Sequence, residues 1–403
     1  MSTPSTASRH NSRGGGRAAR APVIAGLGMT EIGRVYGRSA GQFAADAIRA
    51  AVADAGLALA DIDGLLTSAG VSRGVGLGLQ RDLALRDLRL LSEMNAFGAT
   101  AGAMVQFASM AVQAGMAQVV ACVFADAPLR PDRGAGAVYG GGRAPTGWMG
   151  LVTASGIAGA NPMYALAARR HMLRYGTTSE QLGAIAVAQR GWAALNPLAQ
   201  LREKITIDDY LASRWIAEPF RLLDCCLVSN GGIAVIVTTA ERAAGLARPP
   251  VHVLGWGQGH PGHPFRRSEE FGLSTGAAVS GPAALAMAGV TVADVGVAEL
   301  YDCYTFTVLV TLEDYGFCAK GDGGPFAASG VLGPGGSLKV NTGGGQLSSY
   351  YLWGMTPLSE AVIQARGAAG RRQVPDHDVV LVSGNGGVLD HHSTLVLSPH
   401  PRA

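Results

Sequence analysis

The seven residues AGLALAD, numbers 55–61, recur in the second half of this 403-residue chain as AGVTVAD, numbers 288–294. Each copy ends an alanine-rich stretch, crosses a short Ala-Asp turn and enters an apolar run, at residues 65–66 and 297–300. A glycine after a helical stretch commonly ends the helix, and the apolar run that follows predicts a strand. A second match, VVA at 119–121 with VVL at 379–381, occurs in the same order. Two ordered matches favour an internal duplication over chance similarity between alanine-rich segments.

Strand-like and helical runs alternate along the chain, which is typical of an α/β protein with a buried sheet. Residues 23–28, 119–124, 231–239 and 251–256 predict strands, and residues 40–55 and 99–114 predict helices. The more polar residues 164–195 predict one helix that ends at Asn196-Pro197. Residues 1–21 are rich in Ser, Arg and Gly and contain no acidic residue, so they predict a disordered arm.

The composition excludes several classes of function. With 32 Lys and Arg against 29 Asp and Glu, no molecule-wide field attracts nucleic acid or anionic lipid. The five Cys form no CxxC pair, so we expect neither a disulfide framework nor a metal site, and we expect a cytoplasmic protein. The uncharged residues 95–125 contain three Gln and are interrupted at Gly115, which favours a buried helix and strand over a membrane span.

Two motifs narrow the fold further. RHMLRYGTTSEQL at 170–182 and LLDCCLVSNGG at 222–232 resemble the sterol-carrier-protein-x type of the thiolase superfamily, and the resemblance covers about residues 22–398. It implies the α/β thiolase fold, in which two duplicated βαβαβαββ halves form a five-layered αβαβα core. It also implies an N-terminal half at 22–245, with a loop region inserted at about 127–220, and a C-terminal half at 246–403.

The nucleophile of that superfamily is missing. Thiolases use a Cys at the N-terminus of a buried helix, where the helix dipole and free N–H groups stabilise the thiolate. The matching segment is MNAFGATAGA at 94–103. The Cys position falls on Ala99, or on Gly98 if the alignment shifts by one residue. We therefore expect no acyl-enzyme.

Two His positions of the superfamily are occupied by Tyr. Where sterol-carrier-type thiolases carry His-Asp-Cys-Phe, this chain has YDCY at 301–304. In the glycine-rich stretch NTGGGQLSSYYLWG at 341–354, Tyr351 stands at the second His position. The late Cys-x-Gly-Gly-Gly motif is SGNGG at 383–387. Because the glycine turns persist while both His are exchanged, the pattern argues against random decay of an inactive enzyme.

This combination resembles the thiolase-like aldolases of bacterial steroid side-chain degradation. The resemblance implies that Tyr301 and Tyr351 carry acid–base chemistry, with Asp302 in support. Retro-aldol cleavage needs a base and a site for the thioester enolate but no covalent nucleophile, and a phenol can act as the base if its pKa is lowered. Four residues are our candidates for substrate or oxyanion support: Asn341, Gly344, His392 and Cys303.

The resemblance further implies a bulky 3-hydroxyacyl-CoA as substrate, a steroid side-chain thioester above all, and a ketone plus propionyl-CoA as products. It implies no cofactor, a homodimeric core and a small partner protein with an OB-fold and a zinc ribbon. Two alternatives stay open from the sequence. The first is a thiolase-like acyltransferase whose nucleophile lies elsewhere, and the second is a non-catalytic subunit that binds lipid or scaffolds a partner.

Overall fold

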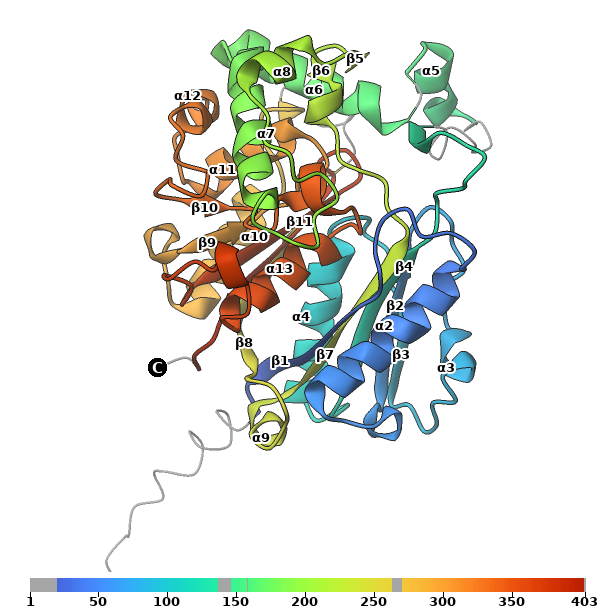
Figure 1. Ribbon diagram of the computed structural model, residues 1–403. Coiled ribbons are helices and arrows are strands. Elements are labelled where there is room, and N and C mark those ends of the chain that lie inside the picture. Colours follow the sequence, from blue (N-terminus) through green and yellow to red (C-terminus); the bar gives the residue numbers. More distant parts are fainter. Residues whose placement is uncertain (1–19, 137–145, 158, 263–269, 402–403) are drawn as a thin grey trace, which may run out of the picture.

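The computed structural model describes residues 20–136, 146–157, 159–262 and 270–401 (Figure 1). Apart from Arg20 and Ala21, the arm predicted for residues 1–21 lies outside the described residues. The first half contains β1 (Pro22–Met29), α2 (Ala40–Ala55), β2 (Gly64–Ala69), α3 (Leu79–Asp82), β3 (Leu90–Glu93), α4 (Thr100–Gln113), β4 (Val120–Asp126), β7 (Gly231–Thr239) and α9 (Ala240–Ala243).

The loop region lies between β4 and β7 and contains α5 (Trp148–Ala154), α6 (Ala160–Tyr175), α7 (Ser179–Ala193), α8 (Ile207–Ala212), β5 (Trp215–Ala217) and β6 (Phe220–Arg221). The second half contains β8 (Val251–Gly259), α10 (Ala277–Ala288), β9 (Val297–Glu299), α11 (Thr305–Tyr315), α12 (Gly323–Ala328), β10 (Lys339–Val340), the π-helical turn η7 (Gly345–Ser349), α13 (Met355–Ala365), β11 (Val380–Gly386) and β12 (His391–Ser398).

The strand order confirms the predicted duplication. The main sheet of the described residues runs β10-β9-β11-β12-β8-β1-β7-β4-β2-β3. From its centre outward, the first half reads β1-β7-β4-β2-β3 and the second reads β8-β12-β11-β9-β10, with the same sequence of antiparallel and parallel pairings. β1 and β8 pair antiparallel where the two halves meet. Each half is thus one βαβαβαββ unit.

The helices complete the predicted αβαβα layering. Helix α2 covers the outer face of the first half and α10 covers the outer face of the second, while α4 and α13 contact strands of both halves. Figure 1 shows α4 and α13 near the middle of the molecule, between the strands of the two halves. The N-termini of these two central helices therefore lie where the halves meet.

The repeated heptapeptides adopt the same local structure. Helix α2 ends at Gly56 and α10 ends at Gly289, both in the left-handed region, with φ of 73° and 71°. The closing aspartate then caps its own turn, because Asp61 accepts from the backbone N–H of Ala58 at 2.8 Å and Asp294 accepts from that of Thr291 at 2.7 Å. Strands β2 and β9 follow these turns. The sequence repeat is therefore a structural repeat down to its hydrogen bonds.

The loop region differs from the prediction in one respect. Residues 164–195 do not form one helix, because α6 ends at Gly176, whose φ is 75°, and α7 begins again after Thr178. Thr178 and Gln181 form a capping box, in which each side chain bonds the backbone N–H of the other residue. These local bonds outcompete a continuous helix at this point.

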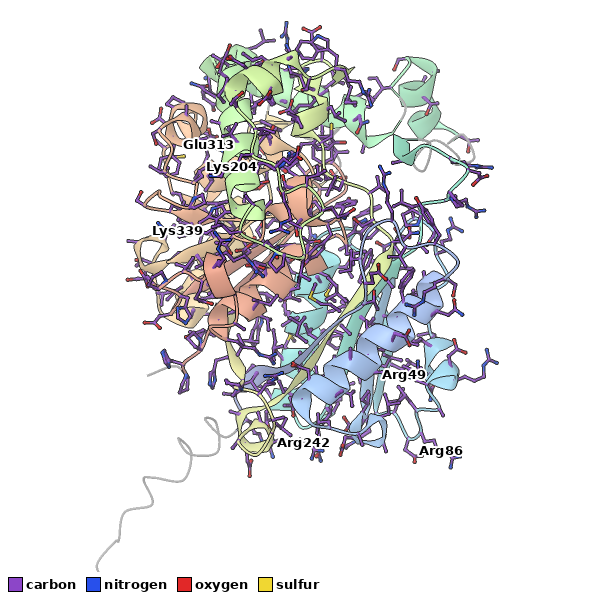
Figure 2. All side chains as sticks on the ribbon, viewed as in Figure 1. Arg49, Arg86, Lys204, Arg242, Glu313 and Lys339 are labelled. Atoms are coloured by element: carbon purple, nitrogen blue, oxygen red, sulfur yellow. The ribbon has the colours of Figure 1, made fainter. Side chains whose placement is uncertain are left out.

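The loop region is fixed to the second half by buried polar contacts. His171 of α6 lies 3.0 Å from the carboxylate of Glu313 on α11, which is labelled in Figure 2. Trp192 of α7 donates to the carbonyl of Leu332 at 3.0 Å. These contacts anchor α6 and α7 of the loop region to the second half. Within the described residues, no helix is both long and apolar enough to cross a membrane.

Candidate active site

A cavity of about 1950 Å³ opens between the two halves and the loop region. Its wall includes aromatic and polar side chains from all three parts of the fold: Phe97, Tyr164, Tyr301, Tyr351, Trp353 and Asn385. Typical ligand pockets are about 300–1,000 Å³, so this cavity has room for a large ligand.

The two tyrosines singled out in the sequence meet in this cavity. Tyr301 follows β9, and Tyr351 lies between the turn η7 and α13. Their hydroxyl oxygens are 3.1 Å apart, and the rings meet edge to face with centroids 6.5 Å apart. Tyr301 is buried and Tyr351 is half-buried. Because either hydroxyl can donate, a proton can be held between the two oxygens.

The loop region fixes the backbone beside Tyr351. The backbone N–H of Tyr351 donates to Oγ of Ser229 at 3.0 Å, and the side chain of Gln200 donates to the same oxygen at 3.0 Å. The backbone N–H groups of Gln200 and Leu201 donate to the carbonyls of Ser349 and Ser348. The position of Tyr351 therefore depends on contacts between distant parts of the chain.

Asp302 lies in the interior and is not among the residues that line the cavity. Its carboxylate accepts from the backbone N–H of Gln346 at 2.9 Å and from that of Leu347 at 3.2 Å. Burial raises the pKa of Asp302 to about 7, although these backbone hydrogen bonds oppose the rise. Because η7 leads directly into Tyr351, we assign Asp302 a positioning role for that residue.

Asn341 and Gly344 shape the same turn and also lie outside the cavity lining. Asn341 has a φ of 52°, and its side-chain oxygen accepts from the backbone N–H of Leu300 at 2.6 Å. Gly344 has a φ of 95° and packs against Ala193 of α7, where a Cβ would collide. Both residues hold the loops that carry the tyrosines, and neither reaches the cavity in this structure.

His392 is buried away from the cavity, on β12. Its Nε2 lies 3.0 Å from the hydroxyl of Tyr315 and 3.0 Å from that of Ser383. Burial lowers the pKa of His392 to about 3, so the imidazole is neutral at physiological pH. The structure does not bring this residue to the tyrosine pair.

Cys303 lines the cavity beside Tyr301. Burial raises the pKa of this thiol to about 12, although neighbouring Tyr164 and Thr307 oppose the rise. The thiol therefore stays protonated at neutral pH, which suits packing or weak donation better than attack on a thioester. Within the described ranges, no group of three His, Cys, Asp or Glu side chains could hold a metal ion.

Sequence reasoning missed Tyr164 and Asn385. Tyr164 of α6 donates to the carbonyl of Gly387 at 2.7 Å and accepts from Nδ2 of Asn385 at 3.0 Å. Burial raises the pKa of Tyr164 well above its ordinary value. Its hydroxyl already donates one hydrogen bond and accepts another, so Tyr164 is a poor base. Its role is to hold the segment from Asn385 to Gly387 in place.

The comparisons with known proteins agree with this geometry. Residues 257–399 match the family model described as Thiolase C-terminal domain-like. A steroid side-chain-cleaving aldolase from Thermomonospora curvata is 39% identical over 381 residues, which cover 91% of this chain and 95% of that protein. The 17-hydroxy-3-oxo-4-pregnene-20-carboxyl-CoA lyase from Mycobacterium tuberculosis is 37% identical and is covered to 96% of its length. The chain belongs to the thiolase-like aldolase family.

A solved structure agrees as well. The structure described as Ltp2-ChsH2(DUF35) aldolase superposes with a TM-score of 0.83 at 37% identity, and the match covers 95% of this chain and 98% of that one. The thiolase superfamily and the fold class predicted from the sequence are therefore confirmed.

In this aldolase-family chain, one of the two positions that align with the superfamily's nucleophile, Gly98, is closed in by backbone and by the Tyr301 ring. Ala99 is the residue that caps the N-terminus of α4 and is 1% exposed. A Cβ on the neighbouring Gly98 would collide with the ring of Tyr301 and with the carbonyl oxygen of Asn385. Of the two aligned positions, Gly98 is the one against which Tyr301 packs, and no side chain fits there.

A second buried carboxyl supports the glycine-rich turn of this aldolase-family chain. Glu299 accepts from the backbone N–H of Thr342 at 3.0 Å and from its hydroxyl at 2.6 Å. Burial, and then the charge of nearby Glu360, raise the pKa of Glu299 to about 8. The stability that this group contributes is present below its ordinary pKa of 4.5 and is lost as pH rises through about 8.

We therefore expect Glu299→Gln to stabilise the protein at high pH, because Gln keeps the acceptor oxygen and cannot ionise. The gain in free energy of unfolding should be on the order of 1–3 kcal/mol at pH 8.5 and smaller at pH 5. Urea unfolding at several pH values measures it, with exposed Glu241→Gln as the control. A gain that is equal at both pH values, or a loss at pH 8.5, would contradict the assignment.

Proposed function

We propose that this protein is an aldolase that cleaves a bulky 3-hydroxyacyl-CoA into a ketone and a shorter acyl-CoA. The observation that carries the proposal is the pair of phenol oxygens, 3.1 Å apart, in a large cavity that has no nucleophile at the family position. The names of the similar proteins support a steroid side-chain thioester as the substrate class. We propose propionyl-CoA as the short product, as the family resemblance implies.

In the proposed reaction, one tyrosine of the pair acts as the base and takes the proton of the 3-hydroxyl group. The C2–C3 bond breaks, C3 becomes the ketone carbon, and the electron pair passes to C2 as a thioester enolate. The second phenol stabilises the negative charge of the first through their hydrogen bond. The proton then returns from the pair to C2, so that no proton is gained or lost.

The enolate oxygen needs hydrogen-bond donors. Asn341, Gly344 and His392 lie outside the cavity lining, whereas the chain from Asn385 to Val388 forms part of the wall. We propose this segment, with Cys303 beside it, as the enolate side of the site. Asp302 would act through the turn that it holds.

The cavity wall also fits a CoA thioester. Three arginines contribute to it, Arg34, Arg73 and Arg214, together with the acidic residues Glu93 and Asp390. Arginine side chains bind phosphate groups by paired hydrogen bonds. We propose that these arginines hold the phosphates of CoA, and that the reaction needs no cofactor beyond this thioester.

We propose a partner subunit as well. The similar solved structure is described as an Ltp2-ChsH2(DUF35) aldolase, which names two components. By that likeness this chain would bind a small partner subunit, which we propose to be of the OB-fold and zinc-ribbon type. We propose that two copies of this chain form the core of the complex and that it works in the cytoplasm. Copurification of the two coexpressed proteins, with mass determination of the complex, tests the assembly.

The proposal excludes acyl transfer through this site. Incubation with acetoacetyl-CoA is expected to leave the intact mass of the protein unchanged, because neither Gly98 nor Ala99 offers a nucleophile. A catalytic thiolase treated in parallel provides the positive control for adduct detection. A stoichiometric acyl adduct on this protein would revive the acyltransferase alternative.

The cleavage reaction itself is tested with 3-hydroxyacyl-CoA thioesters that carry a tertiary hydroxyl, with and without the partner. Mass spectrometry should detect the ketone and the shortened acyl-CoA in equal amounts. If neither product forms from any such thioester with the partner present, the non-catalytic alternative replaces this proposal.

A further inference from the structure

Two turns of the same construction lead into the central helices. In the turn before α4, the backbone N–H of Ala96 donates to Oγ1 of Thr100 at 2.7 Å. In the turn before α13, the backbone N–H of Leu352 donates to Oγ1 of Thr356 at 2.9 Å. The residue that follows the donor is an aromatic one in both turns, Phe97 and Trp353.

Both aromatic residues have a left-handed backbone. The φ of Phe97 is 51° and that of Trp353 is 49°. For a bulky side chain this conformation costs on the order of 1–3 kcal/mol, and such strain is concentrated at functional sites. Glycine would adopt this backbone conformation without that cost. The aromatic side chains at these two positions are therefore best explained by a function of the rings.

The two rings form one continuous part of the cavity wall. Their centroids are 5.9 Å apart, and both residues line the cavity. Trp353 is 8% exposed and rests on Phe124, with centroids 5.0 Å apart. Phe97 is 47% exposed and stacks on His391. Trp353 is therefore held in place by Phe124, whereas Phe97 presents an apolar ring that the described residues leave about half exposed.

This aromatic wall, defined as Phe97 and Trp353, lines the same cavity as the tyrosine pair, and each of its residues is close in sequence to a residue that carries or contacts one of the tyrosines. Gly98, the next residue after Phe97, contacts the ring of Tyr301, and Trp353 lies two residues beyond Tyr351. A substrate whose hydroxyl reaches the two phenols therefore has the substituents of its C3 beside these rings.

Resting on the proposed function, we infer that the aromatic wall determines specificity by binding the flat, apolar ring system attached to C3 of the acyl group. Stacking on the wall positions the hydroxyl at the tyrosine pair. A small acyclic acyl group covers little of the wall and loses that positioning. The wall thus makes the enzyme selective for rigid polycyclic thioesters over short branched ones.

The test compares two substrates. Phe97→Ala is expected to lower the ratio of kcat/KM for a polycyclic tertiary 3-hydroxyacyl-CoA to that for 3-hydroxy-3-methylbutyryl-CoA. A decrease of about 10- to 100-fold is the range in which hydrophobic pockets discriminate. Phe97→Tyr keeps the ring and should preserve the ratio. Met110→Ala, 49% exposed on α4 outside the cavity lining, is the matched control for loss of exposed apolar area.

A binding measurement separates this inference from the proposed function. The polycyclic acyl-CoA without its 3-hydroxyl cannot be cleaved, and calorimetry gives its Kd directly. We expect Phe97→Ala to weaken this binding by about 10-fold or more even if the unmodified protein cleaves nothing. If Phe97→Ala and the unmodified protein had equal Kd values, or if an active enzyme kept its substrate ratio, the inference that the aromatic wall sets specificity would be wrong. If binding depended on the wall but no substrate were cleaved, only the proposed reaction would be wrong.

Discussion

Replacing Tyr351 by phenylalanine is expected to lower kcat for retro-aldol cleavage by about 10²–10⁴-fold, the usual contribution of general acid–base catalysis. Tyr301→Phe should fall in the same range if it is the base, and should lose less if it only supports the other phenol. Each change keeps the ring that packs and removes the hydroxyl that can hold or move a proton. The two oxygens lie 3.1 Å apart, so either deletion also removes one hydrogen-bond partner of the other tyrosine.

The double variant gives a sharper result than either single one. Because the phenols are proposed to act as a unit, Tyr301→Phe with Tyr351→Phe should be little slower than the slower single variant. Tyr350→Phe is the matched control, since its hydroxyl bonds Ser359 at 2.9 Å and lies outside the cavity lining. Near-normal rates in both single variants would refute the tyrosine assignment. Melting temperatures show whether a slow variant is also folded.

The fold was predictable from the sequence because its decisive signals are local. The repeated AGxxxAD stretch encodes a glycine helix end and an aspartate-capped turn, and both form within a few residues. The break between α6 and α7 was local too, in Gly176 and Thr178. The capping bonds between Thr178 and Gln181 decide where the helical stretch breaks, although the composition of residues 164–195 favours one helix.

The candidate site was predictable only in part. Motif positions singled out Tyr301 and Tyr351, whose oxygens the fold brings to hydrogen-bond distance. A motif does not tell which side of a strand or turn a side chain takes, so His392 was singled out although its ring lies outside the cavity lining. Tyr164 could not be found in this way, because its contact with Asn385 spans 221 residues and exists only after the loop region docks.

The second large expected effect concerns Gly98, which packs against the phenol ring of Tyr301. Gly98→Ala should abolish most of the cleavage activity, because the new Cβ would overlap the ring of Tyr301 and the carbonyl oxygen of Asn385. The ring can move, but the backbone of β11 cannot move without disturbing its pairing with β9 and β12. A displacement of about 1 Å at a reacting group can cost about 10²-fold in rate.

The same substitution should also lower stability, by about 1–3 kcal/mol as for other overpacked interiors. Gly78→Ala is the matched control, because there the nearest atom to the new Cβ is the flexible end of Arg81 at 3.9 Å. The measurement is kcat on folded protein at a temperature well below the melting transition of each variant. If Gly98→Ala cleaved its substrate at the normal rate, Tyr301 could not lie against Gly98, and the claim that its ring closes the nucleophile position would fail. A folded, inactive Gly98→Ala beside an active Gly78→Ala would instead show why a thiolase-type Cys cannot be restored at this position by substitution alone: the space for its side chain has been given to the phenol and to β11.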